Sequence, residues 1–205
     1  TRQLTVADGL PSNAVNDFAE DAHGYLWLAT GDGLARFDGR SYRIWRIEDG
    51  LRDNFVWSVH VDARNRVWIG TENAGLVMLT ADRRRFHFYD HRGYPQLLGS
   101  TVWCIESTPD GSVWFGTSNN GLYRLRPDGG MDRFVPVKGD PRSLPATAVN
   151  LLKVDAEGDL WVGTKSGLAR WTGHDFERQR LPAGVSGTVN GLTRDRDGSL
   201  WIADA

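Results

Sequence analysis

The stretch DAEGDLWVGTKSGLARW, residues 155–171, decides the fold of this chain. It opens on Asp155 and Gly158, which favour a tight turn because Asp bonds its own backbone and Gly accepts a positive φ. The segment around Trp161 is apolar on both faces, which predicts a strand buried on both sides of a sheet. The pair Gly167-Leu168 then marks a second turn. The stretch therefore predicts short antiparallel strands joined by tight turns.

The same pattern recurs along the whole chain every 40 to 47 residues. Its central residues are Trp27, Trp68, Trp114, Trp161 and Trp201. Four-stranded blades of β-propellers have this period, and few other architectures do. We therefore expect repeat units at about residues 11–48, 52–92, 99–137, 145–181 and 185–205, the last of them partial.

Each unit can be divided into four strands. The inner strands are expected at Val15–Glu20, Val56–Val61, Val102–Ser107, Val149–Val154 and Val189–Arg194. The second strand carries the Trp, the third follows a Gly-Leu pair, and the outer strand is more polar, as an exposed sheet edge should be. No long segment has the period of 3.6 residues that marks an amphipathic helix. The predicted fold class is all-β, a β-propeller with four complete blades and one partial blade.

The partial fifth unit leads us to expect a fragment of a larger propeller, with seven blades, or ends that pair with another molecule. The stretch QLTVADGL from Gln3 matches the outer strand and exit loop of a preceding blade. It could supply the outermost strand of a closing blade, but the third strand of unit five has no candidate.

The charge balance argues against nucleic acid as a partner. The chain has 24 basic and 26 acidic residues and a net charge of −2, which gives no basic footprint. The densest basic run, Arg83–Arg85, is expected to be a solvated hairpin tip. The lone Cys104 excludes an internal disulfide and a thiolate metal site. No stretch approaches the ~20 apolar residues of a membrane-spanning helix.

The units resemble the two-component regulator propeller repeat, whose consensus is approximately D-x-x-G-x-L-W-I-G-T-x-x-G-L. Residues 155–171 and DAHGYLWLATGDGLARFDG from Asp21 match it nearly throughout, and DGLPSNAV from Asp8 is similar to its interblade phrase. The resemblance implies the periplasmic sensor part of an inner-membrane receptor, with a histidine kinase or diguanylate cyclase (cyclic-di-GMP) output and an oligosaccharide or an unknown ligand. A dimer is a further possibility.

Residues that break the repeat on one face are the candidate ligand contacts. Loops from outer to inner strand, and from second to third strand, should open on the same face of a propeller. The candidates there are Asp32, Asn54, Trp57, Glu72, Asn73, Trp103, Asn119, Asn120, Asn150 and Lys165. Trp57 and Trp103 stand where other units have Asn. Rings that stack on sugar faces and amides that bond hydroxyls would form a sugar-binding surface, although both Trp could instead pack on a neighbouring blade.

No catalytic or metal-binding constellation is expected. The repeated Asp residues should lie in separate blades and the repeated Trp residues in the core. His87 and His91 are about 13 Å apart if both lie on one strand, too far to share a metal. We predict a non-catalytic sensor module without a cofactor. The alternatives are a passive protein-interaction scaffold and, less favoured, an enzyme that resembles the streptogramin lyase propellers, which use a catalytic His and a divalent ion.

Overall fold

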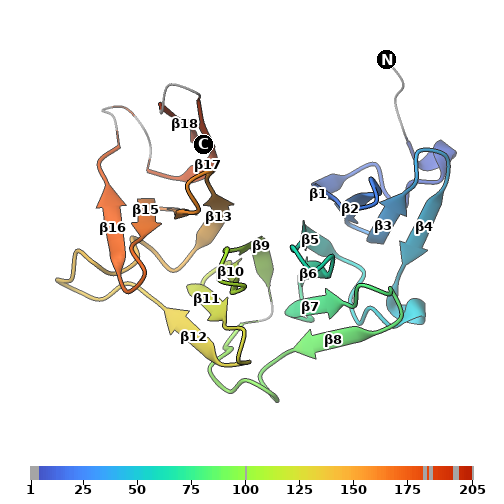
Figure 1. Ribbon diagram of the computed structural model, residues 1–205, viewed down its shortest axis with the longest axis horizontal. Helices are drawn as coiled ribbons and strands as arrows, with labels where there is room; N and C mark the ends of the chain where they lie inside the picture. The colour runs from blue at the N-terminus through green and yellow to red at the C-terminus, as the bar shows by residue number, and fades with distance from the viewer. Residues whose placement is uncertain (1–4, 100, 182–183, 185–186, 196–198, 205) are drawn as a thin grey trace. The chain divides into compact units, whose positions relative to one another are not determined.

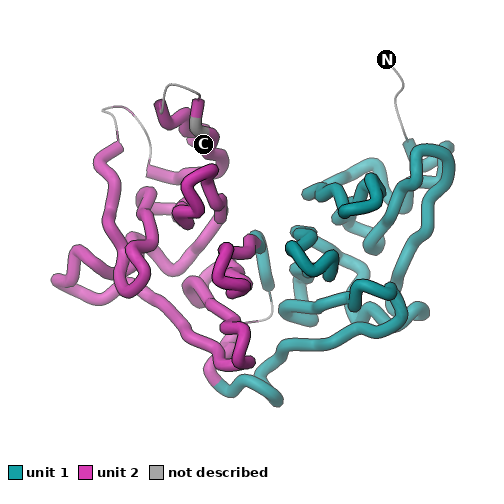
Figure 2. The backbone as a smooth tube through the Cα atoms, viewed as in Figure 1, with its two compact units in different colours: residues 1–95, 100–105 teal, residues 96–99, 106–205 magenta. Residues whose placement is uncertain are grey.

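A computed structural model describes residues 5–99, 101–181, 184, 187–195 and 199–204. The chain divides into two compact units, one of residues 1–95 with 100–105 and the other of residues 96–99 with 106–205 (Figure 2). Within the described residues the regular structure is strands and two short 3₁₀ turns (Figure 1). The predicted all-β class is confirmed.

Two four-stranded antiparallel sheets make up most of the first unit. The first sheet contains β1 (Val15–Glu20), β2 (Leu26–Thr30), β3 (Gly33–Phe37) and β4 (Tyr42–Trp45), in that order. The second sheet contains β5 (Val56–Val61), β6 (Val67–Thr71), β7 (Leu76–Leu79) and β8 (Phe86–Tyr89). Consecutive strands pair in each sheet, as blades of a propeller require.

The remaining strands repeat this arrangement. A third sheet has the order β12-β11-β10-β9, with β9 (Val102–Ser107), β10 (Val113–Thr117), β11 (Leu122–Leu125) and β12 (Met131–Phe134). A fourth contains β13 (Val149–Val154), β14 (Leu160–Thr164), β15 (Gly167–Trp171) and β16 (Phe176–Gln179). The last sheet pairs β17 (Val189–Arg194) with β18 (Leu200–Asp204). All five predicted inner strands are confirmed with their bounds.

The two 3₁₀ turns precede inner strands at equivalent places. Val6–Asp8 and Ile47–Asp49 each end at a glycine with positive φ, Gly9 at 100° and Gly50 at 97°. This confirms that the DGL phrase before the first unit is the same exit loop as the one before the second. The expected extra outer strand would begin at Gln3, which lies outside the described residues.

The core lies between neighbouring sheets. In the first unit, Trp27 and Ala29 of β2 pack in one cluster with Val56 and Val59 of β5. Because each β-strand alternates its side chains between two faces, one strand can serve two interfaces, and its apolar residues are buried on both.

The expectation that every repeated Trp lies in the core holds for four of the five. Trp27, Trp68, Trp114 and Trp161 are at most 6% exposed, but Trp201 is 63% exposed. The reason is that β18 belongs to a two-stranded sheet, so that no third strand or further sheet covers its ring within the described chain.

The repeated Asp residues are structural, as predicted, and their carboxylates have a second role beyond the turn. The carboxylates of three of them accept a hydrogen bond from the indole N–H of the repeat Trp: Asp21–Trp27 (2.9 Å), Asp62–Trp68 (2.8 Å) and Asp155–Trp161 (2.9 Å). In the third sheet the acceptor is Thr108 Oγ1, at 3.1 Å from the indole nitrogen of Trp114. These bonds satisfy the only polar group of a buried indole.

The prediction for the basic run is wrong at its first residue. Arg84 and Arg85 are exposed, but the Arg83 side chain is only 9% exposed. Its guanidinium donates to Asp21 Oδ2 at 2.9 Å and lies 4.8 Å from the centroid of the Trp27 ring. The hairpin between β7 and β8 therefore places one arginine over the turn of the neighbouring sheet, where an ion pair and a cation–π contact compensate its desolvation.

Candidate functional site

The candidate face is built around a β-bulge that recurs at the second residue of the inner strands. The pairing register shifts at this point in β1, β5, β13 and β17. The bulged residues are Asn16, Trp57, Asn150 and Asn190, and Trp103 has the corresponding position in β9. A bulge leaves its residue out of the ladder and redirects its side chain, and bulges are frequent beside binding sites. The sequence position where Trp replaces Asn is thus a structurally distinct one.

Where the bulged residue is Asn, its amide joins neighbouring sheets. Asn16 Nδ2 donates to the carbonyl oxygen of Val56 at 2.7 Å, and Asn150 Nδ2 donates to Asn190 Oδ1 at 3.0 Å. In each unit, such a bond runs from the bulged residue of one inner strand to the region of the bulge in the next inner strand. Asn at the bulge therefore contributes to the join between blades as well as lining the face.

Trp57 makes a different set of contacts. Its indole N–H donates a short hydrogen bond to Glu72 Oε2, and its ring lies 4.8 Å from that of Phe55, tilted by 51°. Glu72 is fixed in turn, because its backbone N–H donates to the carbonyl oxygen of Phe55 at 3.1 Å and its own carbonyl accepts from Thr101 Oγ1 at 2.9 Å. Phe55 is 36% exposed. The result is a small aromatic surface held in place by a carboxylate.

Three further candidates in the first unit are engaged in local structure. The Asp32 carboxylate accepts from Arg46 at 2.9 Å, which balances its charge. Asn54 Oδ1 accepts the backbone N–H of Ile47 at 2.8 Å, a bond repeated by Asn13 before the first inner strand. The backbone N–H of Asn73 donates to Asp53 Oδ2 at 2.6 Å, while its side chain is exposed. Asn54 is thus a turn residue, and Asn73 offers its amide to solvent.

Two of the four candidates in the second unit contact each other. Asn120 Nδ2 donates to Asn119 Oδ1 at 2.7 Å, and Arg133 donates to the carbonyl oxygen of Asn120 at 2.9 Å. Lys165 is exposed, and its backbone N–H donates to the carbonyl oxygen of Ala148 at 3.1 Å. Asn150 lies beside Asn190, as described above. Trp103, in the first unit, is half-buried.

The structure therefore brings together Trp57 with Glu72, Asn119 with Asn120, and Asn150 with a residue outside the predicted set, Asn190. It also adds Phe55, which sequence reasoning missed. A signal for Phe55 was present: the segment Asn13–Asn16 reads NAVN, whereas residues 54–57 read NFVW, so that two aromatic substitutions fall within one four-residue motif.

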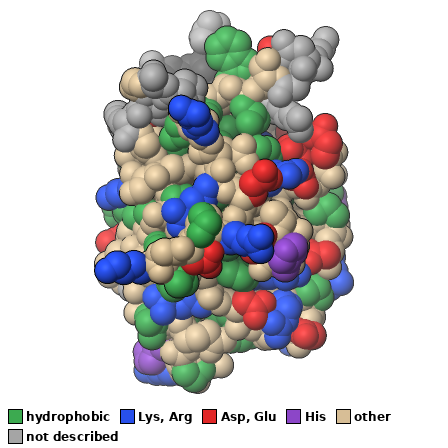
Figure 3. Space-filling model, turned by 90° about the vertical axis from the view of Figure 1, so that its left-hand side faces the viewer, with side chains coloured by type: hydrophobic (Ala, Val, Ile, Leu, Met, Phe, Trp, Pro, Cys, Tyr) green, Lys and Arg blue, Asp and Glu red, His purple; other side chains and the backbone are tan. Residues whose placement is uncertain are grey.

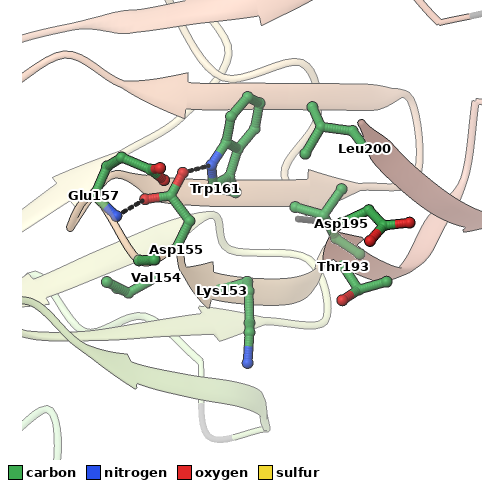
Figure 4. A pocket seen from close by; sticks show the side chains of 10 residues that line it. Lys153, Val154, Asp155, Glu157, Trp161, Thr193, Asp195 and Leu200 are labelled. Carbon is green, nitrogen blue, oxygen red and sulfur yellow. Dashed lines mark hydrogen bonds between the residues drawn. The ribbon is translucent and has the colours of Figure 1, made fainter. Parts of the chain in front are cut away.

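A cavity of about 380 Å³ lies at the opposite end of β14 from Lys165 (Figure 4). It is bounded by the turn between β13 and β14 and by β17 and β18, and Trp161, Thr193 and Leu200 line it. The Asp155 carboxylate at its wall accepts from the Trp161 indole at 2.9 Å and from the backbone N–H of Glu157 at 3.1 Å. This carboxylate thus has the same turn role as in the other sheets, and the cavity contains none of the predicted ligand contacts.

Nothing in the described ranges groups three metal-ligating side chains together. His87 lies on β8 and His91 follows the end of that strand. On the face shown in Figure 3, basic and acidic side chains are interspersed and form no single-sign field. In the part of the chain that the structure describes, no helix is long and apolar enough to span a membrane.

Four-stranded antiparallel sheets in sequence order, each with a Trp-bearing second strand, define the chain as a β-propeller module. A family model described as two component regulator propeller matches residues 9–32, 50–73, 96–119 and 143–166. The chain belongs to this family.

Solved structures of low sequence identity share the fold. The extracellular domain of a putative hybrid two-component system from B. thetaiotaomicron is 23% identical, with a TM-score of 0.67 over 99% of this chain and 34% of that one. Virginiamycin B lyase from Staphylococcus aureus is 15% identical, with a TM-score of 0.72 over 93% of this chain and 63% of the lyase. The fold thus occurs in both a regulatory protein and an enzyme.

A curated relative matches a short stretch. Histidine kinase P4 of Formosa agariphila is 42% identical over 45 residues, which is 22% of this chain and 3% of the kinase. The chain therefore spans a small part of that relative and about a third of the two-component extracellular domain. Family and relatives together support a regulatory propeller module.

Proposed function

We propose that this chain is part of the periplasmic, ligand-sensing propeller of a membrane-anchored two-component or cyclic-di-GMP receptor, and that it is not catalytic. Family membership supports the regulatory role. The resemblance to an extracellular domain of a hybrid two-component system agrees with a location outside the cytoplasm. A histidine kinase or diguanylate cyclase would carry the output.

The ligand would bind at the bulge face, with Trp57 as its main contact. The observation that carries this proposal is the Phe55–Trp57–Glu72 cluster, because its two rings are adjacent, partly exposed and fixed by a carboxylate. Other units accept Asn at the Trp57 position, so that the blade does not require a ring there. Fixed rings beside amide side chains suit an oligosaccharide, whose apolar faces stack on aromatic rings while its hydroxyls bond amides.

The test is binding of a panel of neutral and acidic oligosaccharides, amino acids and divalent ions, measured by thermal shift and then by calorimetry. A ligand at 100 times its dissociation constant should stabilise the protein by about 2.7 kcal/mol. Trp57→Asn should abolish the shift with an oligosaccharide, because it installs the residue that other bulges carry. Trp57→Phe keeps a ring without the N–H and should retain part of the affinity.

The matched control is His87→Ala, which changes an exposed side chain on β8, the outer strand of the same sheet, and leaves the aromatic cluster intact. It should weaken binding much less than Trp57→Asn. An oligosaccharide whose affinity is unchanged by Trp57→Asn would contradict the site. A protein that responds to no member of the panel would contradict small-molecule sensing by this segment and leave the scaffold as the better reading.

A further inference from the structure

The first sheet carries two arginines that lie opposite each other on neighbouring strands. Arg36 of β3 pairs with Arg43 of β4 in the antiparallel register. The Arg43 side chain is exposed and that of Arg36 is half-buried. Within the part of the chain that the structure describes, neither guanidinium forms an ion pair or a hydrogen bond. Like charges directly opposite each other destabilise a sheet, so that this pair needs an explanation.

Two other sheets provide a carboxylate for the arginine at this point of the third strand. In the fourth sheet Arg170 lies opposite Glu177. Its guanidinium donates to Glu177 Oε2 at 2.8 Å and to Asp159 Oδ2 at 2.7 Å. In the third sheet Arg124 donates to Asp110 Oδ2 at 2.7 Å. The first sheet keeps the arginine of this arrangement without the acids.

Aromatic rings hold both guanidinium groups in place of the acids. The Cζ atom of Arg36 lies 4.3 Å from the ring centroid of Tyr25, which stands where the fourth sheet has Asp159. The Cζ atom of Arg43 lies 4.7 Å from that of Trp45. A ring attracts a cation without neutralising it. The Arg36 Nε atom is buried without a hydrogen-bond partner, which leaves the donors on its two Nη atoms open to solvent.

The second sheet adds positive charge to this face instead of compensating it. Its Leu79 packs with Trp27 in one apolar cluster. Its Arg83 lies 4.8 Å from the centroid of the Trp27 ring, and Arg36 lies 5.9 Å from the same centroid. The Asp21 carboxylate also reaches this side, but it is already paired with Arg83 at 2.9 Å. The two opposed arginines therefore keep an excess of positive charge.

We propose that Arg36 and Arg43 bind a dianionic oxyanion of phosphate or sulfate chemistry. A guanidinium fork matches two oxygens of such an anion, and two forks side by side match its two charges. The anion would take the place that Glu177 and Asp159 have beside the arginine of the fourth sheet. The site belongs to β3 and β4, so that it does not depend on the ligand proposed for Trp57.

A nuclear magnetic resonance titration of the ¹⁵N-labelled 205-residue chain with inorganic phosphate tests the site, at constant ionic strength and a mildly alkaline pH that keeps phosphate dianionic. The Nε–Hε resonance of Arg36 should shift and reach saturation. Arg43→Glu supplies the acid that the fourth sheet has at this position and should weaken binding by at least about tenfold. Arg43→Gln removes the charge alone and should have a smaller effect.

Arg92→Glu is the matched control, because it makes the same change of charge at an exposed arginine in the loop after β8. It should leave the affinity within about twofold, since solvent screens distant surface charges. Near-ultraviolet circular dichroism verifies that each variant is folded. Tighter binding of glucose 6-phosphate than of phosphate would assign a monoester as the ligand, and equal binding would assign the free ion. No saturable shift with either compound, or an equal loss in Arg92→Glu, would overturn the proposal.

Discussion

Replacing Arg83 by Met tests how much the ion pair between the first two sheets contributes to stability. The Arg83 guanidinium donates to Asp21 Oδ2 at 2.9 Å and to the carbonyl oxygen of Asn65 at 2.6 Å. The paired side chains are 9% and 1% exposed, so that solvent screens this ion pair little. Methionine keeps much of the contact with the Trp27 ring while it removes the charge and all the donors.

The expected loss follows from what remains at Asp21. Removing one partner of a buried ion pair costs about 3–5 kcal/mol when the other is left without compensation. Asp21 keeps hydrogen bonds from the Trp27 indole and from the backbone N–H groups of His23 and Tyr25. We therefore expect a smaller loss, about 2–3 kcal/mol, which lowers the urea midpoint of the first unit by about 1–2 M.

Urea unfolding followed by tryptophan fluorescence and near-ultraviolet circular dichroism measures this loss. Arg85→Met is the control, because Arg85 belongs to the same hairpin and is exposed. A double-mutant cycle with Asp21→Asn should give a coupling free energy of at least about 1 kcal/mol. Equal midpoints for Arg83→Met and Arg85→Met would refute the argument that the buried pair joins the sheets.

Two other predictions concern acid and backbone strain. Burial alone would raise the pKa values of Asp21 and Asp62, but hydrogen bonds from Trp indoles, backbone N–H groups and arginines outweigh burial and lower each pKa below the ordinary 3.8. The stabilising contribution of these groups, measured by urea titrations at a series of pH values, should therefore be full above pH 3.8 and fall as the pH drops through the folded-state pKa values. Gly33→Ala should cost more stability, by thermal denaturation, than Gly39→Ala, because both have positive φ but only the Gly33 Cβ would lie 2.7 Å from the Trp45 carbonyl oxygen.

The sequence was sufficient to predict the strands and their bounds because each blade repeats the same local signals. An Asp-to-Gly turn, a doubly apolar strand around a Trp and a Gly-Leu turn fix three strand boundaries, and at least four copies of each signal in one chain remove the ambiguity of any single copy. The bounds of Val15–Glu20 and its four equivalents follow directly. The indole bond to Asp21 was not foreseen, because it depends on where a turn side chain points in space.

Contacts made between sheets were beyond sequence reasoning. Nothing in the run Arg83–Arg85 distinguishes its first residue, and only the hairpin geometry, with Arg83 at a φ of 60°, directs its guanidinium to Asp21. The exposure of Trp201 was missed for the related reason that burial of a repeat residue depends on the neighbouring sheet. Repetition predicts what a residue is suited to contact, and only the structure shows whether that partner is in place.

The bulge allows the side chain at the proposed ligand site to differ between units without loss of the blade. Residues before and after it, such as Val56 and Ser58, are buried and fixed by packing. The bulged residue between them is free of the ladder, and its side chain can be Asn, as in Asn16, or Trp, as in Trp57. Asn16 bonds the backbone carbonyl of Val56 in the next sheet, whereas Trp57 bonds the side chain of Glu72 in the loop that follows β6 of its own sheet. The proposed ligand site therefore lies at a position where the side chain can change without altering the strand pairing on either side of it.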